Sequence, residues 1–197
     1  MSTSKIVLIV FAFLFVIVGF WGCNGYNGLV SADQSLQKVW SNVETNYQRR
    51  TDLYNSIIKT IEGSANFEKS TLKEVLEARS NATKVQVNIN DAASLEAYQK
   101  AQSALQGSFS RLMAVAENYP ELKTTAAFRD FQTQIEGTEN RINVARQDYN
   151  AAIESYNNRV KRFPGNILAG LFGFGAKPFY KADAGTEKAP DIQFNIK

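Results

Sequence analysis

The residues best suited to chemistry in this sequence are charged side chains in two well-separated segments. They are Arg49, Arg50, Asp52, Glu139, Arg141 and Arg146. Guanidinium groups held together can bind an anion, and a carboxylate beside them can act as a general base. The same residue types also form structural ion pairs that join two helices. Both interpretations are open, and we expect the structural polar network.

Arg50 interrupts an otherwise apolar row with a seven-residue spacing, within a helix expected from Leu29 to about Gly63. The row reads Leu29, Leu36, Val43, Arg50, Ile57. The same expected helix has a second apolar row with the same spacing, and Asp33 interrupts that row in the same way. Either residue can lie at an edge and extend its charge to water, or it can form a buried polar layer that fixes the helix register. We expect Arg50 to pair with a carboxylate of the last helix, Glu139 or a neighbour.

Two pairs of glutamates with a three-residue spacing, Glu74 with Glu77 and Glu136 with Glu139, are similar to the carboxylate pairs of di-iron bundles. Those sites also require histidine, and this sequence contains none. The commonest general base and metal ligand is therefore missing. The sequence also lacks a phosphate-binding glycine loop and a nucleophile elbow. We predict no catalytic residue, no metal, no cofactor and no enzyme activity.

Overall charge and cysteine usage exclude further classes of protein. The net charge is +3, and no run of five lysines or arginines occurs, so we predict no binding to nucleic acid. The single cysteine, Cys23, excludes an internal disulfide and a thiolate metal cluster. The asparagines Asn157 and Asn158 are expected on a solvated helix face.

The N-terminal segment is the strongest indication of location. Ile6 to Cys23 is a run of eighteen residues without charge, which reaches the lower limit for a membrane-spanning helix. Trp21 and Tyr26 are suited to the interface of such a helix. The sequence predicts a cell-membrane protein with a single N-terminal span. Lys5 weakly favours a cytoplasmic N-terminus, and the side that carries the rest of the chain stays open.

Two alternatives to a retained span are open. A cleaved signal peptide would need a small-residue cleavage site, and the sequence has no Ala-x-Ala pattern there. A lipoprotein would be acylated at Cys23 after Gly22, although Phe20 and Trp21 fit that signal poorly. Beyond the apolar run, the Asn-Gly pairs at 24–25 and 27–28 predict a bend.

An apolar ladder of six residues that are seven apart predicts the last long helix. It consists of Phe128, Ile135, Ile142, Tyr149, Tyr156 and Phe163. Shorter apolar patterns predict a helix over 67–82 and one that follows a cap at Asp91 and ends near Tyr119. The fold class is therefore all-α: a transmembrane helix, then an antiparallel bundle of three long helices and one short one, and an irregular tail. The expected domains are 1–28, 29–163 and 164–197.

The tail combines glycines with large apolar side chains, which are seldom left together in water. The cluster consists of Ile167, Leu168, Leu171, Phe172 and Phe174. It can dock on its own bundle, on a neighbouring subunit or into the bilayer.

The sequence resembles the LemA family of bacterial membrane proteins over nearly its full length. The resemblance lies in Tyr26–Leu29, Gln48–Asp52, Glu136–Ile142, Phe163–Ile167, Phe172–Phe174 and Ala182–Pro190. Phe67 stands where the family usually has histidine, and 54–56 also depart from its pattern. The resemblance implies one N-terminal membrane segment and a helical bundle, and it brings no established catalytic activity.

These observations predict a membrane-anchored helical scaffold or adaptor that assembles with itself or binds a membrane protein. Its expected partners are the lipid bilayer, further copies of the chain and a membrane protein. The alternative is a receptor or enzyme that uses the Arg/Glu set of the first and last helices to bind a ligand or an anion.

Overall fold

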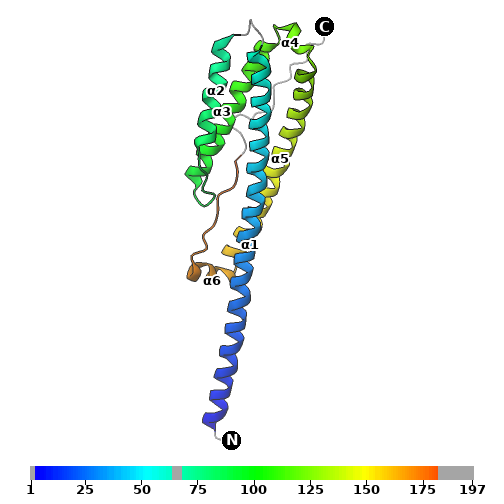
Figure 1. Cartoon of the computed structure of the whole chain (residues 1–197). Coiled ribbons are helices and arrows are strands. Elements are labelled where there is room, and N and C mark those ends of the chain that lie inside the picture. The colour runs from blue at the N-terminus through cyan, green and yellow to red at the C-terminus, as the bar shows by residue number, and fades with distance from the viewer. Residues whose placement is uncertain (1–2, 64–67, 182–197) are drawn as a thin grey trace, which may run out of the picture. The chain divides into compact units, whose positions relative to one another are not determined.

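The computed structural model describes residues 3–63 and 68–181, which are all-α without strands (Figure 1). The helices are α1 (Thr3–Glu62), α2 (Lys69–Lys84), α3 (Ala92–Ala116), α4 (Pro120–Lys123), α5 (Ala126–Lys161) and α6 (Gly165–Phe172). Three long helices and the short α2 match the prediction. Phe67 and the motif at 182–190 lie outside the described residues.

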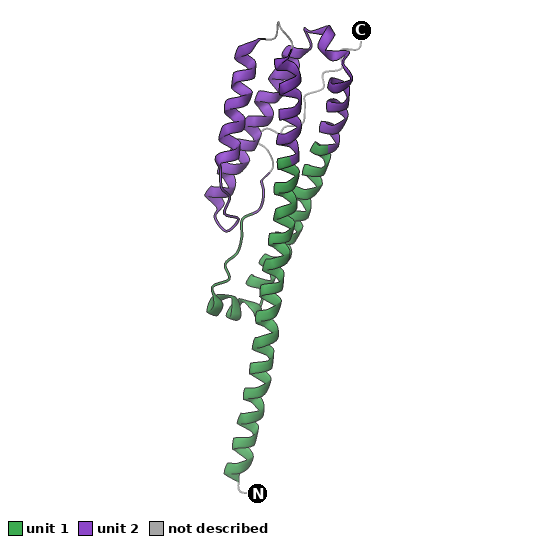
Figure 2. Ribbon diagram, in the orientation of Figure 1, with its two compact units in different colours: residues 1–48, 138–178 green, residues 49–137, 179–197 purple. Residues whose placement is uncertain are grey.

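The chain divides into two compact units, coloured separately in Figure 2. Unit 1 comprises residues 1–48 and 138–178, and unit 2 comprises residues 49–137 and 179–197. The long helices α1 and α5 therefore contribute residues to both units. Each unit has its own aromatic contacts and buried apolar side chains, so each is described by itself.

In unit 1, α1 and α5 pair in antiparallel fashion through the predicted apolar rows. The ring centre of Trp40 on α1 lies 5.1 Å from that of Tyr149 on α5, in an edge-to-face arrangement. Leu36 and Val43 are buried on α1, as are Ile142 and Tyr156 on α5. Such ladders bury one stripe of each helix, and aromatic pairs add directional contacts.

Phe163, the last residue of the predicted ladder, is an exception. It is 80% exposed and follows the end of α5 at Lys161. The seven-residue spacing keeps a side chain on the buried stripe only while the helix continues. The expectation that Phe163 packs in this stripe was therefore wrong.

The predicted bend at residues 24–28 was also wrong, because α1 continues without interruption from Thr3 to Glu62. The glycines there allow close approach. A Cβ atom on Gly25 would lie 2.3 Å from Cδ1 of Leu168, and one on Gly28 would lie 3.4 Å from Nη1 of Arg159. Glycine inside a helix costs about 1 kcal/mol relative to alanine, and here it makes room for α6 and for an arginine of α5.

Unit 2 contains the end of α1 together with α2, α3, α4 and the beginning of α5. Its core includes Tyr54 stacked on Phe109, with ring centres 3.7 Å apart, and Phe131 at 5.3 Å from Phe109. Asp91 caps α3 as predicted, because its carboxylate accepts hydrogen bonds from the backbone amides of Ala93 and Ser94.

The tail is more regular than its glycine content suggested. It contains α6, which ends at Gly173 with φ 75°, a left-handed conformation that glycine adopts without steric cost. The expectation of an irregular segment was wrong for residues 165–172. Leu168 and Ala169 are buried on one side of this helix, and their packing stabilises it.

Candidate functional site

Arg50 lies in a buried polar layer of unit 2. Its side chain is 0% exposed, and Nη2 donates to Oε1 of Gln102 at 2.7 Å and to the backbone oxygen of Gln102 at 3.2 Å. Its guanidinium carbon lies 5.9 Å from the ring centre of Tyr54. Burial excludes the interpretation in which Arg50 reaches water at an edge, since its row faces the core. The expected pairing with Glu139 stays a prediction.

Arg146 of unit 1 donates to the hydroxyl oxygen of Tyr47, from Nε at 2.8 Å and also from Nη2. This contact joins α5 to α1 through a charged donor and a neutral acceptor, which is stronger than a neutral pair. The other members of the predicted polar set differ in burial: Arg49, Asp52 and Arg141 are exposed, and Glu139 is half-buried. The structural network joining all six residues stays a prediction.

A second polar cluster in unit 1 fastens the segment that follows α6. Lys177 is buried, and its Nζ contacts Oδ1 of Asp33 and lies 4.8 Å from the ring centre of Tyr156. Asn157 is buried too and bonds the backbone of Lys177, so its assignment to a solvated face was wrong. Sequence reasoning missed this cluster, although the position of Asp33 in an apolar row was a signal.

Burial perturbs two tyrosines of unit 1. It raises the pKa of Tyr149 to about 12 from the ordinary value of 10.0. The pKa of Tyr156 is also raised, first by burial and then by the charge of Asp33. Tyrosine is neutral at physiological pH even at its ordinary pKa, and these upward shifts make loss of the proton harder still, which suits structural residues rather than general bases.

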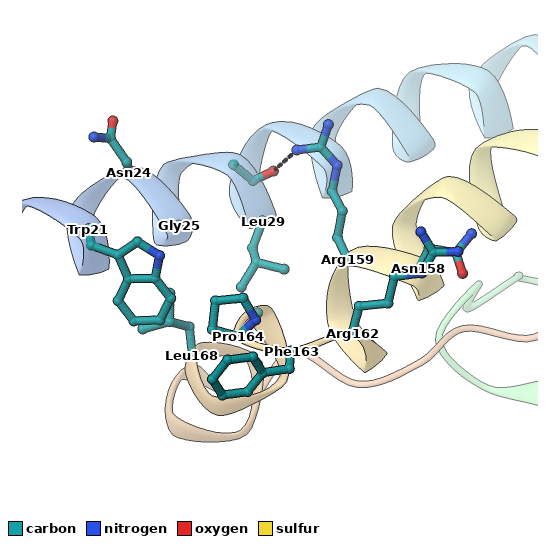
Figure 3. A pocket seen from close by; sticks show the side chains of 12 residues that line it. Trp21, Asn24, Gly25, Leu29, Asn158, Arg159, Arg162, Phe163, Pro164 and Leu168 are labelled. Atoms are coloured by element: carbon teal, nitrogen blue, oxygen red, sulfur yellow. Dashed lines mark hydrogen bonds between the residues drawn. The ribbon is translucent and has the colours of Figure 1, made fainter. Parts of the chain in front are cut away.

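A pocket of about 400 Å³ lies in unit 1 between α1, the end of α5 and α6 (Figure 3). Its lining includes Trp21 and Gly25 of α1, Arg159 and Arg162 around the end of α5, and Phe163. Arg159 points toward α1 and donates from Nη1 to the backbone oxygen of Gly28 at 3.4 Å.

The tail residues predicted to dock are divided by the structure. Leu168 is buried at the pocket, whereas Ile167, Leu171 and Phe172 are exposed. The ring centres of Phe172 and Phe174 lie 4.7 Å and 6.0 Å from that of Tyr26 on α1. Part of the apolar cluster therefore contacts its own unit, and part faces outward.

Of the two acidic pairs considered for metal binding, the pair of Glu74 and Glu77 has other contacts. Oε2 of Glu74 accepts a hydrogen bond from Nε of Arg111 at 3.3 Å, and Glu77 lies 3.8 Å from Lys73. Over the described part of the chain, no group of three or more histidine, cysteine or acidic side chains has the arrangement that a metal needs. Cys23 is exposed on α1 with a free thiol, and its acylation stays a prediction.

Of the described helices, α1 is long and apolar enough to cross a membrane. None of the residues in its most apolar eighteen-residue window is buried within the structure. Large side chains such as Phe11, Phe15 and Phe20 are exposed along it.

Comparisons with known proteins place these features in a family context. A family model described as the LemA family matches residues 39–194. Two magnetosome proteins of Paramagnetospirillum magneticum, MamQ 1 and MamQ 2, are each 26% identical over 175 residues, covering 79% of this chain and 64% of the relative. Protein LemA of Metamycoplasma hominis is 26% identical over 164 residues, covering 83% of this chain and 69% of the relative. The chain thus spans just under two thirds of the length of the MamQ relatives.

Proposed function

This chain belongs to the LemA family, and from that premise we propose that it is a membrane-anchored helical scaffold or adaptor without catalytic activity. In this proposal the apolar segment of α1 crosses the bilayer once, and the helical units hold further copies of the chain or another membrane protein. The observation that carries the proposal is the apolar segment itself, because its side chains are exposed.

Exposure of that segment supports a lipid environment. Apolar patches larger than a few hundred Å² are rarely left in water by soluble proteins. Burial of apolar surface is favourable by roughly 25 cal/mol per Å², so a run of large aliphatic and aromatic residues partitions strongly into hydrocarbon. At about 1.5 Å per residue, Ile6 to Cys23 extends roughly 27 Å, close to the thickness of a bilayer core.

The contacts of the charged residues support a structural rather than a catalytic role. Arg50 is fully buried against Gln102, so a solute in the surrounding solvent does not reach its guanidinium group. Arg146 contacts Tyr47, a neutral residue whose hydroxyl accepts its hydrogen bonds. These contacts favour the scaffold over the alternative of an anion-binding receptor or enzyme built on the same set.

Membrane anchoring is tested by carbonate extraction of membranes that contain the full chain. Wild-type protein should stay in the membrane pellet. The double variant Phe13→Arg with Val16→Arg should be released, because each arginine at the centre of a span costs about 3 kcal/mol. The matched control Ser35→Arg with Asn42→Arg adds the same charge at exposed positions of α1 beyond the apolar run and should stay in the pellet.

Release of wild-type protein by carbonate would refute anchoring. Loss of anchoring in Cys23→Ser, together with a diacylated N-terminus on the wild-type protein, would refute the span in favour of a lipid anchor. Assembly is tested separately, by mild detergent extraction followed by mass measurement. A strict monomer with no co-purifying protein would refute the scaffold.

A further inference from the structure

The outward side of α6 and of the turn before it carries large apolar side chains. Phe163 is 80% exposed, Ile167 57% and Leu171 74%. Ile167 and Leu171 are four residues apart, so they lie on the same side of the helix. Leu168 and Ala169 are buried on its other side. This helix therefore packs on its own unit through one side and presents a second apolar side to its surroundings.

The position of α6 along α1 indicates what those surroundings are. Leu168 packs at Gly25, which follows the end of the apolar segment at Cys23 by two residues. Two residues advance an α-helix by about 3 Å. The headgroup layer on each side of a bilayer core is roughly 5–8 Å thick. A bilayer around the apolar segment would thus have its headgroups at the level of α6.

The side chains around the pocket suit that level. Trp21 of α1 lies beside Leu168, and Phe163 lies beside Pro164 on the turn before α6 (Figure 3). Tryptophan and phenylalanine are favoured at the boundary between headgroups and acyl chains. Trp21, Leu168 and Phe163 thus place apolar side chains around the pocket at the level where the apolar segment ends.

The charge of the pocket lining indicates which class of lipid would bind there. Its lining contains two guanidinium groups, those of Arg159 and Arg162, and no carboxylate. Lys161 lies between them in sequence and is exposed. Arginine binds phosphate through paired donors, and cations near an anionic membrane surface are attracted to it.

We propose that the α6 elbow, residues 159–172, is a second membrane contact that recognises anionic phospholipid. Phe163, Ile167 and Leu171 enter the headgroup boundary, and Arg159 and Arg162 bind lipid phosphates. This inference rests on the proposed anchoring by α1 and adds to it a preference for lipid charge. The position of α6 just beyond the end of the apolar segment, together with the basic lining of the pocket, favours lipid over a protein partner as the occupant.

The experiment uses the full chain in vesicles of phosphatidylcholine, with or without phosphatidylglycerol. In a Cys23→Ser background, Ile167→Cys carries an environment-sensitive fluorophore, and the lipid carries a quencher near the top of its acyl chain. The matched control is Asn143→Cys, an exposed position on α5. Strong quenching is expected at 167 and little at 143, and phosphatidylglycerol should deepen the quenching at 167 severalfold.

Charge reversal tests the arginines. Arg159→Glu with Arg162→Glu should abolish the effect of phosphatidylglycerol, whereas Lys123→Glu with Arg129→Glu, at exposed positions of α4 and α5, should leave it intact. Reversal of Arg159 also removes its contact with Gly28. Arg162→Glu alone and a salt titration therefore give a second measurement. Added salt should weaken quenching in anionic vesicles and leave it unchanged in neutral ones.

Failure of the inference and failure of the anchor give different results. Protein that carbonate washes from the vesicles would refute the anchor. Protein that is retained, but with as little quenching at 167 as at 143, would refute the second membrane contact. Equal quenching with and without phosphatidylglycerol would refute recognition of anionic lipid. A blue-shifted fluorophore at 167 without quenching would mean that protein covers the elbow, which also overturns the proposal.

Discussion

Asn157 holds Lys177 through both backbone groups of that lysine. The side-chain Nδ2 of Asn157 donates to the carbonyl of Lys177 at 2.9 Å, and its Oδ1 accepts from the backbone amide at 2.8 Å. The amide side chain thus pairs with the peptide as a neighbouring strand would. Because the lysine side chain also reaches Asp33 on α1, the segment after α6 is fastened to both long helices of unit 1.

Asn157→Leu should release this segment. It leaves the backbone groups of Lys177 buried without these partners, which costs about 1–3 kcal/mol for each unsatisfied group. Hydrogen exchange at residues 174–177 should accelerate by at least tenfold, while α5 stays protected. Asn158→Ala, at the adjacent half-buried position, is the control and should change exchange little. Unchanged exchange in Asn157→Leu would contradict this role.

Two tyrosine-to-phenylalanine substitutions in unit 1 should have opposite effects. The hydroxyl of Tyr47 accepts hydrogen bonds from Arg146, so Tyr47→Phe should lower the free energy of unfolding by about 1–3 kcal/mol. The hydroxyl of Tyr149 is buried and has no hydrogen-bond partner among the described residues. Tyr149→Phe removes that unsatisfied group and should leave the melting temperature equal or higher. A large loss of stability in Tyr149→Phe would mean that the buried hydroxyl of Tyr149 forms a stabilising hydrogen bond, and would refute this interpretation.

The raised pKa of Tyr149 predicts a loss of stability at alkaline pH. Because the folded state keeps the phenol protonated, the unfolded state releases its proton first as pH rises. The free energy of unfolding should therefore fall between pH 10.0, the ordinary pKa, and about 12, the pKa in the folded state. Lysines and other tyrosines titrate there too, so the comparison is with Tyr149→Phe. Denaturant unfolding should show the wild type losing more stability than the variant over this interval, and parallel curves would contradict the pKa.

Arg50 and Gln102 should be energetically coupled. Arg50→Leu leaves the buried side chain of Gln102 without its charged donor, at a cost of about 2 kcal/mol. The double variant with Gln102→Leu removes both polar groups and should be more stable than the two single effects predict, by about 1–3 kcal/mol. Chemical denaturation of the wild type, the two single variants and the double variant gives the four free energies of unfolding that this double-mutant cycle requires. Additive effects would mean that the hydrogen bond contributes nothing to stability.

The sequence predicted the features that depend on periodicity and local chemistry. The rows through Leu36 and Tyr149 located the paired faces of α1 and α5, and Asp91 marked the start of α3. Arg50 was placed on the correct row, but the row alone left its burial and an edge position both open, and burial proved correct. These predictions succeeded because helical periodicity and capping depend on residues that lie close together in the sequence.

The missed features depend on contacts between distant segments. Gly25 is typical of a bend until Leu168 is known to pack against it. Asn157 is typical of a solvated surface until the backbone of Lys177 lies across it. That backbone belongs to an irregular segment without periodicity, so no local sequence pattern predicts its position.

Because α1 is continuous from its apolar segment through Leu29 and Leu36, the side chains of the apolar segment point in fixed directions relative to the row that packs on α5. Each helical residue turns the chain by about 100° and advances it by about 1.5 Å. One residue inserted after Trp21 would therefore rotate the apolar segment by about 100° relative to the row that packs on α5, whereas a seven-residue insertion would restore the phase to within about 20°. The direction in which the apolar segment presents each of its side chains is thus set by the part of α1 that packs on α5.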